Sequence, residues 1–166
     1  MKRFLLAFAL VFAALSGEAA QIQRPHGRID PYRKEYGGYG YTLVSNDRYT
    51  AWWAEGAYKM MEDTPLPTRR AKKIELKSAR RESESFILVV RPKVRIENFE
   101  LSVDDLRASG GVIGANGNVV IRRVDYVKVW RAANEYSYDG MWPDPLPEAE
   151  GLMTLAPDTN YAFWIT

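Results

Sequence analysis

The chain contains no cysteine and only one histidine, His26, among its 166 residues. Without cysteine no disulfide can form and no lipid can be attached at a cleaved N-terminus, so stability must come from a packed core or from metal and partner contacts. Zinc sites and nucleophilic triads need residue types that are absent or isolated here. His26 lies next to Pro25 in a Gly/Pro-rich stretch, which favours a solvated side chain over a catalytic one. We therefore expect no catalytic residue, no metal ligand and no cofactor.

Helical periodicity and an excess of one charge are also lacking. No long segment repeats apolar residues at helical spacing, and no Gly-rich phosphate loop is followed by a lysine. The formal net charge is +2, which gives no reason to expect a nucleic-acid partner. These absences favour an all-β protein without nucleotide chemistry.

The N-terminus carries the features of a secretory signal peptide. Lys2 and Arg3 precede an apolar run over residues 4–15, and small residues follow. The run has twelve residues, whereas a helix that crosses a bilayer needs about 20. Cleavage after Ala19 suits the small-residue preference at the exit site. We therefore expect a soluble, exported protein, periplasmic or extracellular, with a signal peptide over residues 1–19 and no membrane anchor.

The rest of the chain divides into a short leader and one domain. Glycine, proline and tyrosine interrupt any periodicity over residues 20–41, which predicts a flexible leader. Residues 42–166 show the short apolar runs and turn signals of an antiparallel β-sandwich of immunoglobulin-like or jelly-roll-like type. The length suffices for one packed domain.

Individual strands can be assigned from the apolar pattern. Residues 86–90 are apolar on both faces, which predicts a central strand that ends at Pro92. Alternating residues predict a half-buried strand over 74–77, and residues 119–130 form a long strand candidate with a bulge or a bend between sheets. The run over residues 161–166 stops while it still has the pattern of a strand. We expect the domain to lack its last strands, so that this run forms an exposed edge.

A proline-rich loop over residues 142–147 is the main candidate for a functional site. Three prolines in five residues hold an extended backbone that presents Trp142 and Asp144, and Tyr138 precedes it. The functional interpretation is a sugar-stacking aromatic ring with a carboxylate beside it. The alternative is a rigid strut that caps the sandwich or packs on a neighbouring domain. The strut is favoured, because tryptophan usually buries its large apolar area.

Two charged runs receive structural interpretations. Asp104 and Asp105 lack further oxygen ligands at regular spacing, so solvated carboxylates at a strand end are favoured over calcium ligands. The basic run over residues 69–73 precedes an amphipathic segment and is interpreted as a solvated loop.

Several motifs resemble the N-terminal β-sandwich of glycoside hydrolase family 123-like proteins. Residues 80–92 are similar to that domain's charged block followed by an apolar strand and proline, although Ser83 stands where the family favours an aromatic residue. Residues 119–129 resemble its Tyr-Val strand, with Tyr126 and Val127 in place. Residues 142–147 are similar to its Trp-Pro-Asp-Pro-Leu-Pro loop.

The resemblance extends over roughly residues 50–166. Residues 52–59 and 164–166 also match the family, the latter at the start of its next strand. It implies a larger parent enzyme in which a (β/α)₈ barrel of about 250 residues follows the sandwich. In the family an adjacent Asp-Glu pair in that barrel is thought to cleave β-linked N-acetylgalactosaminides with help from the substrate's acetamido group. This chain has no Asp-Glu dipeptide, so no catalytic residue carries over.

The resemblance thus implies a non-catalytic N-terminal module that supports a catalytic barrel, in an apparently truncated exported protein acting on N-acetylgalactosamine-containing glycans. Two alternatives remain open. One is a free-standing carbohydrate-binding module that uses Trp142 and exposed tyrosines. The other is a structural interaction domain.

Overall fold

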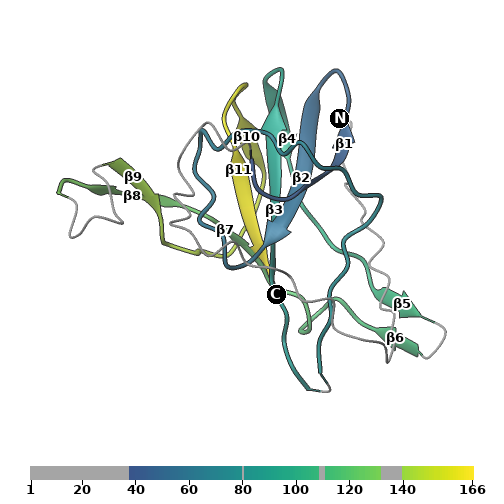
Figure 1. Ribbon diagram of the computed structural model, residues 1–166. Helices are drawn as coiled ribbons and strands as arrows, with labels where there is room; N and C mark the ends of the chain where they lie inside the picture. The colour runs from purple at the N-terminus through teal and green to yellow at the C-terminus, as the bar shows by residue number, and fades with distance from the viewer. Residues whose placement is uncertain (1–37, 80, 109–110, 132–139) are drawn as a thin grey trace.

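The computed structural model describes residues 38–79, 81–108, 111–131 and 140–166 (Figure 1). This part of the chain is all-β, as the sequence predicted, and its strands pair antiparallel. The strands are β1 (Tyr41–Ser45), β2 (Tyr49–Glu55), β3 (Phe86–Pro92), β4 (Ile96–Phe99), β5 (Leu106–Ala108), β6 (Gly111–Ile113), β7 (Ile121–Arg123), β8 (Tyr126–Val129), β9 (Gly140–Pro143), β10 (Met153–Leu155) and β11 (Tyr161–Ile165).

The central element is a five-stranded sheet with the order β1-β2-β3-β11-β7. The apolar strand β3 occupies the middle position, and its residues are buried on both faces, which confirms the prediction from its sequence. In the register of this sheet Leu88 lies between Trp53 and Phe163, and Val89 lies between Trp52 and Ala162. Alternate residues of β3 therefore support two separate apolar layers.

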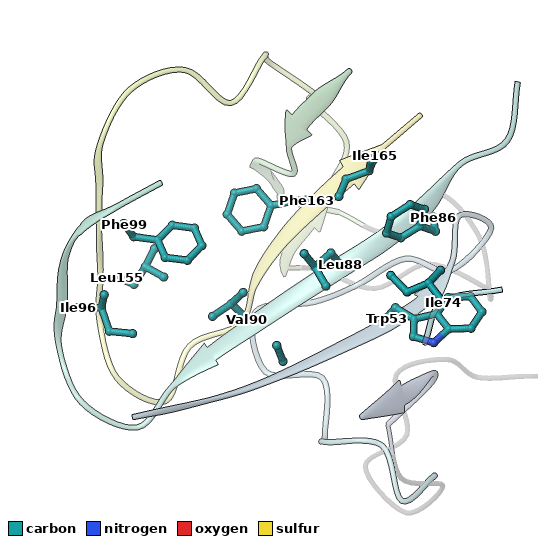
Figure 2. Packing of buried hydrophobic residues seen from close by; sticks show 11 residues of the cluster. Trp53, Ile74, Phe86, Leu88, Val90, Ile96, Phe99, Leu155, Phe163 and Ile165 are labelled. Atoms are coloured by element: carbon teal, nitrogen blue, oxygen red, sulfur yellow. The ribbon is translucent and has the colours of Figure 1, made fainter. Parts of the chain in front are cut away.

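The first layer fills the space between the sheet and the pair β4–β10. Figure 2 shows Phe86, Leu88 and Val90 of β3 on the same side as Phe163, with Phe99 of β4 facing them. The rings of Phe99 and Phe163 stack with their centroids 5.7 Å apart. The packing of the β4–β10 pair against the five-stranded sheet gives the sandwich arrangement, although this pair contains only two short strands.

The second layer covers the opposite face of the sheet with a loop. Trp52, Ile87 and Val89 are buried there beneath Met60. The buried Asn160 side chain, just before β11, donates hydrogen bonds to the carbonyl oxygens of Met61 (3.0 Å) and Thr64 (2.9 Å). These bonds hold the loop over residues 60–64 on the sheet.

Strand β11 is not an edge strand, so the expected exposed edge is wrong. β11 pairs with β3 on one side and with β7 on the other. The outer strands are β1 and β7, and both are covered by irregular segments. Thr42 of β1 exchanges backbone hydrogen bonds with residues 69–71, and β7 does so with residues 147–149. Sequence position therefore did not indicate spatial position, because non-consecutive strands pair in this sheet.

Two strand predictions need correction. Residues 74–77 form no strand, although Ile74 is buried and Glu75 is exposed as their alternation predicts. The long candidate over residues 119–130 is divided at Val124 and Asp125 into β7 and β8, which belong to different sheets. This confirms a bend between sheets.

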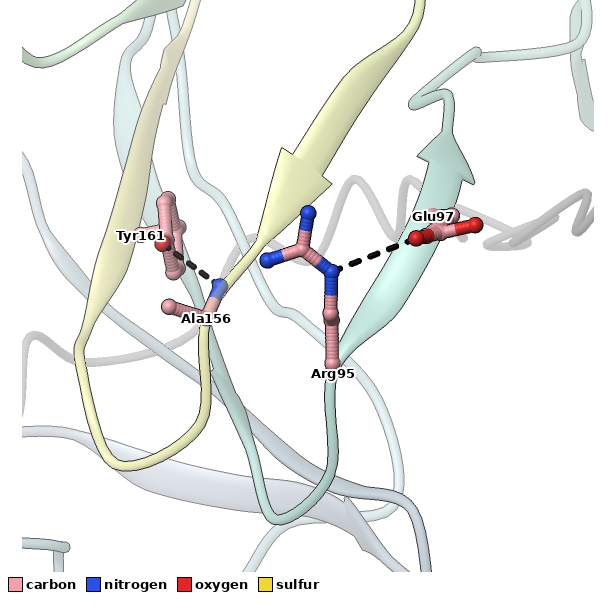
Figure 3. A network of polar contacts seen from close by, with 4 residues as sticks. All are labelled: Arg95, Glu97, Ala156 and Tyr161. Carbon is pink, nitrogen blue, oxygen red and sulfur yellow. Dashed lines mark hydrogen bonds and ion pairs between the residues drawn. The ribbon is translucent and has the colours of Figure 1, made fainter.

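Short polar contacts occur near the ends of β4, β10 and β11. Figure 3 shows the backbone amide of Ala156, after β10, which donates a hydrogen bond of 2.8 Å to the phenol oxygen of Tyr161. In the same view the Nε of Arg95 lies 3.2 Å from a carboxylate oxygen of Glu97. The first contact links the start of β11 to the end of β10, while the second is an exposed ion pair that contributes little.

Candidate functional site

The proline-rich segment lies along the edge of the main sheet. The carbonyl oxygen of Pro145 accepts a hydrogen bond of 2.9 Å from the amide of Asp125, and that of Pro147 accepts one of 2.8 Å from the amide of Arg123. The amide of Ala149 donates to Ile121 over 3.0 Å. Proline cannot donate, but its carbonyl can accept, so an edge position suits these residues. The segment thus covers one edge of the main sheet.

Trp142 and Asp144 lie at the start of this segment and differ in their surroundings. Trp142 belongs to β9, where it is half-buried and opposite Val127 of β8. The Asp144 side chain is exposed, and its amide donates to the carbonyl of Asp125 over 3.2 Å. Tyr138, the third residue selected from the sequence, lies outside the described residues.

A bidentate ion pair reinforces the bend between β7 and β8. The guanidinium of Arg123 donates to both carboxylate oxygens of Asp125, with an Nη2–Oδ2 distance of 2.8 Å. This hydrogen bonding raises the pKa of Arg123. Both side chains remain partly exposed, so the pair orients the bend more than it stabilises the fold.

The ribbon of β8 and β9 stands away from the main sheet (Figure 1). Its exposed apolar residues are Val127, Met141 and, just beyond β8, Trp130, which is 82% exposed. The ammonium group of Lys128 lies 5.4 Å from the centroid of the Trp130 ring. Isolated two-stranded ribbons are only marginally stable in water. The exposed apolar residues therefore suit a surface that another domain covers.

Of the two acidic residues selected from the sequence, Asp104 is exposed and Asp105 has structural contacts. Asp105 accepts a hydrogen bond of 3.0 Å from the amide of Ala115, and its second oxygen lies 3.4 Å from Arg107. These contacts brace the loop that follows β6. No group of three or more potential metal ligands occurs in the part of the chain that the structure describes.

A cluster of tyrosines is the constellation that sequence reasoning missed. The rings of Tyr39 and Tyr58 stack with centroids 4.4 Å apart. The ring of Tyr41 stacks on Trp53 at 5.5 Å, and the guanidinium of Arg69 lies 5.8 Å from the Tyr41 ring centroid. Burial raises the pKa of Tyr58, and the charge of Glu55 raises it further. We name Tyr39, Tyr41, Glu55, Tyr58 and Arg69 the tyrosine cluster.

The sequence pattern that leads into this cluster was interpreted as a flexible leader. The alternation of glycine and tyrosine over residues 37–41 predicted a flexible leader. In the structure residues 38–41 lie against the body of the protein, and the amide of Gly38 donates to Leu66 over 3.2 Å. A Cβ on Gly40 would stand 2.0 Å from the carbonyl oxygen of Trp53. Gly38 and Gly40 thus allow a close approach of the backbone, which brings Tyr39 and Tyr41 against the sheet.

Fold and geometry together define an all-β protein of the sandwich type with a projecting ribbon. The sequence matches no protein-family model and no curated protein. Among the residues that the structure places, none belong to a helix of the length and apolarity that a bilayer crossing requires.

Proposed function

We propose that this chain is a non-catalytic β-sandwich module of an exported glycoside hydrolase family 123-like enzyme that acts on N-acetylgalactosamine-containing glycans. In this proposal the module supports a catalytic (β/α)₈ barrel of the same parent protein. The motif resemblance over residues 50–166 suggests the family, and the all-β fold is compatible with the sandwich that it implies.

The projecting ribbon is the observation that carries the proposal of an accessory module. Val127, Trp130 and Met141 are exposed on it, whereas the large apolar residues of the main sheet are buried or half-buried. Apolar side chains of this size, gathered on a projecting two-stranded ribbon, are typical of a surface that packs on a neighbouring domain. The proline-rich segment holds the base of the ribbon. The ammonium of Lys59 also donates a hydrogen bond of 3.2 Å to the carbonyl oxygen of Pro143.

Limited proteolysis tests this role of the ribbon. We expect the isolated chain to be cut first within residues 126–143, and the protein purified from its natural source to be protected there and to have a larger mass. Equal cleavage at this position in both, or a natural product no larger than this chain, would contradict the module.

Hydrolysis tests the assignment of activity. The isolated chain should not cleave aryl N-acetyl-β-galactosaminides above the uncatalysed rate, because no carboxylate pair of the family's kind is present. The larger natural protein should cleave them. Cleavage by the isolated chain, or its absence in the larger protein, would remove the proposed link to this family.

The free-standing carbohydrate-binding module stays the second candidate, and the tyrosine cluster favours it over a purely structural domain. If Trp142 is the ligand contact of such a module, the chain should bind sugar. Trp142→Ala should then abolish this binding without unfolding the protein. If the substitution leaves sugar binding unchanged, Trp142 is not the ligand contact and has only a structural role in the ribbon.

A further inference from the structure

The tyrosine cluster gathers aromatic rings and two opposite charges from three segments of the chain. Tyr39 precedes β1, and Tyr41 is its first residue. Glu55 is the last residue of β2, and Tyr58 follows that strand. Arg69 comes from the segment that covers β1. The three tyrosines are half-buried, whereas Glu55 and Arg69 are exposed. The cluster therefore presents ring surface and charged groups at one corner of the main sheet.

The backbone fixes this arrangement before any ligand binds. Gly40 has φ +100, and its missing Cβ lets the chain approach the carbonyl oxygen of Trp53. Tyr39 is thereby held against Tyr58, and Tyr41 is held against Trp53. Arg69 also donates a hydrogen bond of 3.4 Å to the phenol oxygen of Tyr41. Rings that are already ordered lose little conformational entropy on binding.

The charges of the cluster select the kind of ligand. The carboxylate of Glu55 accepts hydrogen bonds, and the guanidinium of Arg69 donates them, each more strongly than a neutral group. Glu55 and Arg69 both lie near enough to Tyr58 to act on its pKa, the first raising it and the second lowering it. A ligand with a net charge is attracted by one of these groups and repelled by the other, so it gains little. A neutral ligand with an apolar face and several hydroxyls fits both the rings and the charges. A pyranose has these properties, since its C–H face packs on aromatic rings.

We propose that the tyrosine cluster binds one pyranose unit of a neutral glycan, with its C–H face on the Tyr39–Tyr58 pair and its hydroxyls bonded to Glu55 and Arg69. This site is separate from Trp142 and does not depend on the proposed parent enzyme. Failure of the hydrolysis experiment above would leave it intact, and its own failure would leave the accessory role intact.

The test is an NMR titration of the ¹⁵N-labelled chain with three neutral trisaccharides: N,N′,N″-triacetylchitotriose, cellotriose and one with terminal N-acetylgalactosamine. With at least one of them we expect saturable shifts at the amides of residues 39–41 and 55–58, with a Kd of about 0.1–10 mM. Tyr58→Ala should weaken this binding at least about tenfold, whereas Tyr58→Phe, which keeps the ring, should stay within about threefold. Tyr49→Ala is the matched control, because Tyr49 is also half-buried but lies at the other end of β2.

Glu55→Gln keeps the test decisive if Tyr58→Ala fails to fold, since the Glu55 side chain is exposed. It should weaken binding at least about fivefold, as loss of a charged acceptor does. Tetramethylammonium serves as the probe for a cation cage. No saturable shift with any trisaccharide, binding unchanged in folded Tyr58→Ala or in Glu55→Gln, or tighter binding of tetramethylammonium than of every sugar would overturn the proposal.

Discussion

Individual residues connect the central sheet to the layers on its two faces. Leu88 is 1% exposed and contributes to the face that packs on β4 and β10, while Val89, next to it in sequence, belongs to the opposite face. Asn160 holds the covering loop through two hydrogen bonds made by one buried amide group. Gly40 is needed because it has no Cβ: the backbone of β2 occupies the space where a Cβ would lie.

Leu88→Ala should lower the free energy of unfolding by about 2–5 kcal/mol, because it leaves a cavity between the sheet and β4–β10. Chemical denaturation measures this change. Val112→Ala on the exposed strand β6 removes a similar amount of side chain at a site that is 56% exposed, so it should change the free energy by less than about 0.5 kcal/mol. Equal effects of the two substitutions would show that β3 is not the centre of the core.

Gly40→Ala and Gly117→Ala separate steric overlap from backbone strain. Both glycines have positive φ, but nothing lies within 4 Å of a Cβ built on Gly117. Gly117→Ala should therefore cost about 1–2 kcal/mol, from the left-handed conformation alone. Gly40→Ala adds a clash with a backbone oxygen that cannot move aside easily, and should cost at least about 3 kcal/mol. Thermal unfolding of both variants gives the comparison; a Gly40→Ala that is no less stable than Gly117→Ala would contradict the close approach.

At the scale of elements, irregular segments replace the strands that usually protect a sheet. The outer strands β1 and β7 would expose unpaired backbone groups and invite edge-to-edge association. Residues 69–71 and 147–149 cover these edges with backbone hydrogen bonds but add no strand to the assigned sheet. The proline-rich segment thus stabilises the fold whether or not Trp142 contacts another molecule.

Hydrogen exchange tests both covers at once. The amides of Thr42 and Ala71 at one edge, and of Arg123 and Ala149 at the other, donate to backbone carbonyls. We expect each to exchange at least about 100-fold more slowly than in an unstructured peptide. The amide of Gly117 in the exposed turn before β7 is the comparison and should exchange fast. Rapid exchange at either edge would mean that its cover opens readily in solution.

At the scale of the whole molecule, one sheet is covered on both faces and extended by two ribbons, β5–β6 and β8–β9 (Figure 1). The main sheet and its covers account for the buried apolar residues, whereas the ribbons carry several of the exposed ones. This division suits a stable body that presents separate surfaces to other molecules.

Export is the prediction that belongs to the whole chain. If residues 1–19 are a cleaved signal peptide, the protein recovered from a secreting host should begin at Ala20 or Gln21. Intact-mass measurement of the purified product distinguishes these ends. A product that retains Met1 and stays with the membrane fraction would contradict the signal peptide.

The sequence by itself determined the all-β class, the central position of residues 86–90 and an irregularity, a bulge or a bend, within residues 119–130. These properties follow from local patterns of apolar residues, turns and charges, which act over a few neighbouring positions. It also indicated that the proline-rich segment is extended, because proline fixes its own backbone angle.

Only the tertiary structure decided which segments lie side by side. Pairing of β11 with both β3 and β7 placed the last strand inside the sheet, although its sequence suggested an edge. Ile74 is buried without belonging to a strand, because side-chain packing and backbone pairing are separate requirements. Tyr39, Glu55 and Arg69 meet through contacts between segments far apart in sequence, and the glycines that permit this approach have the same local pattern as a flexible leader.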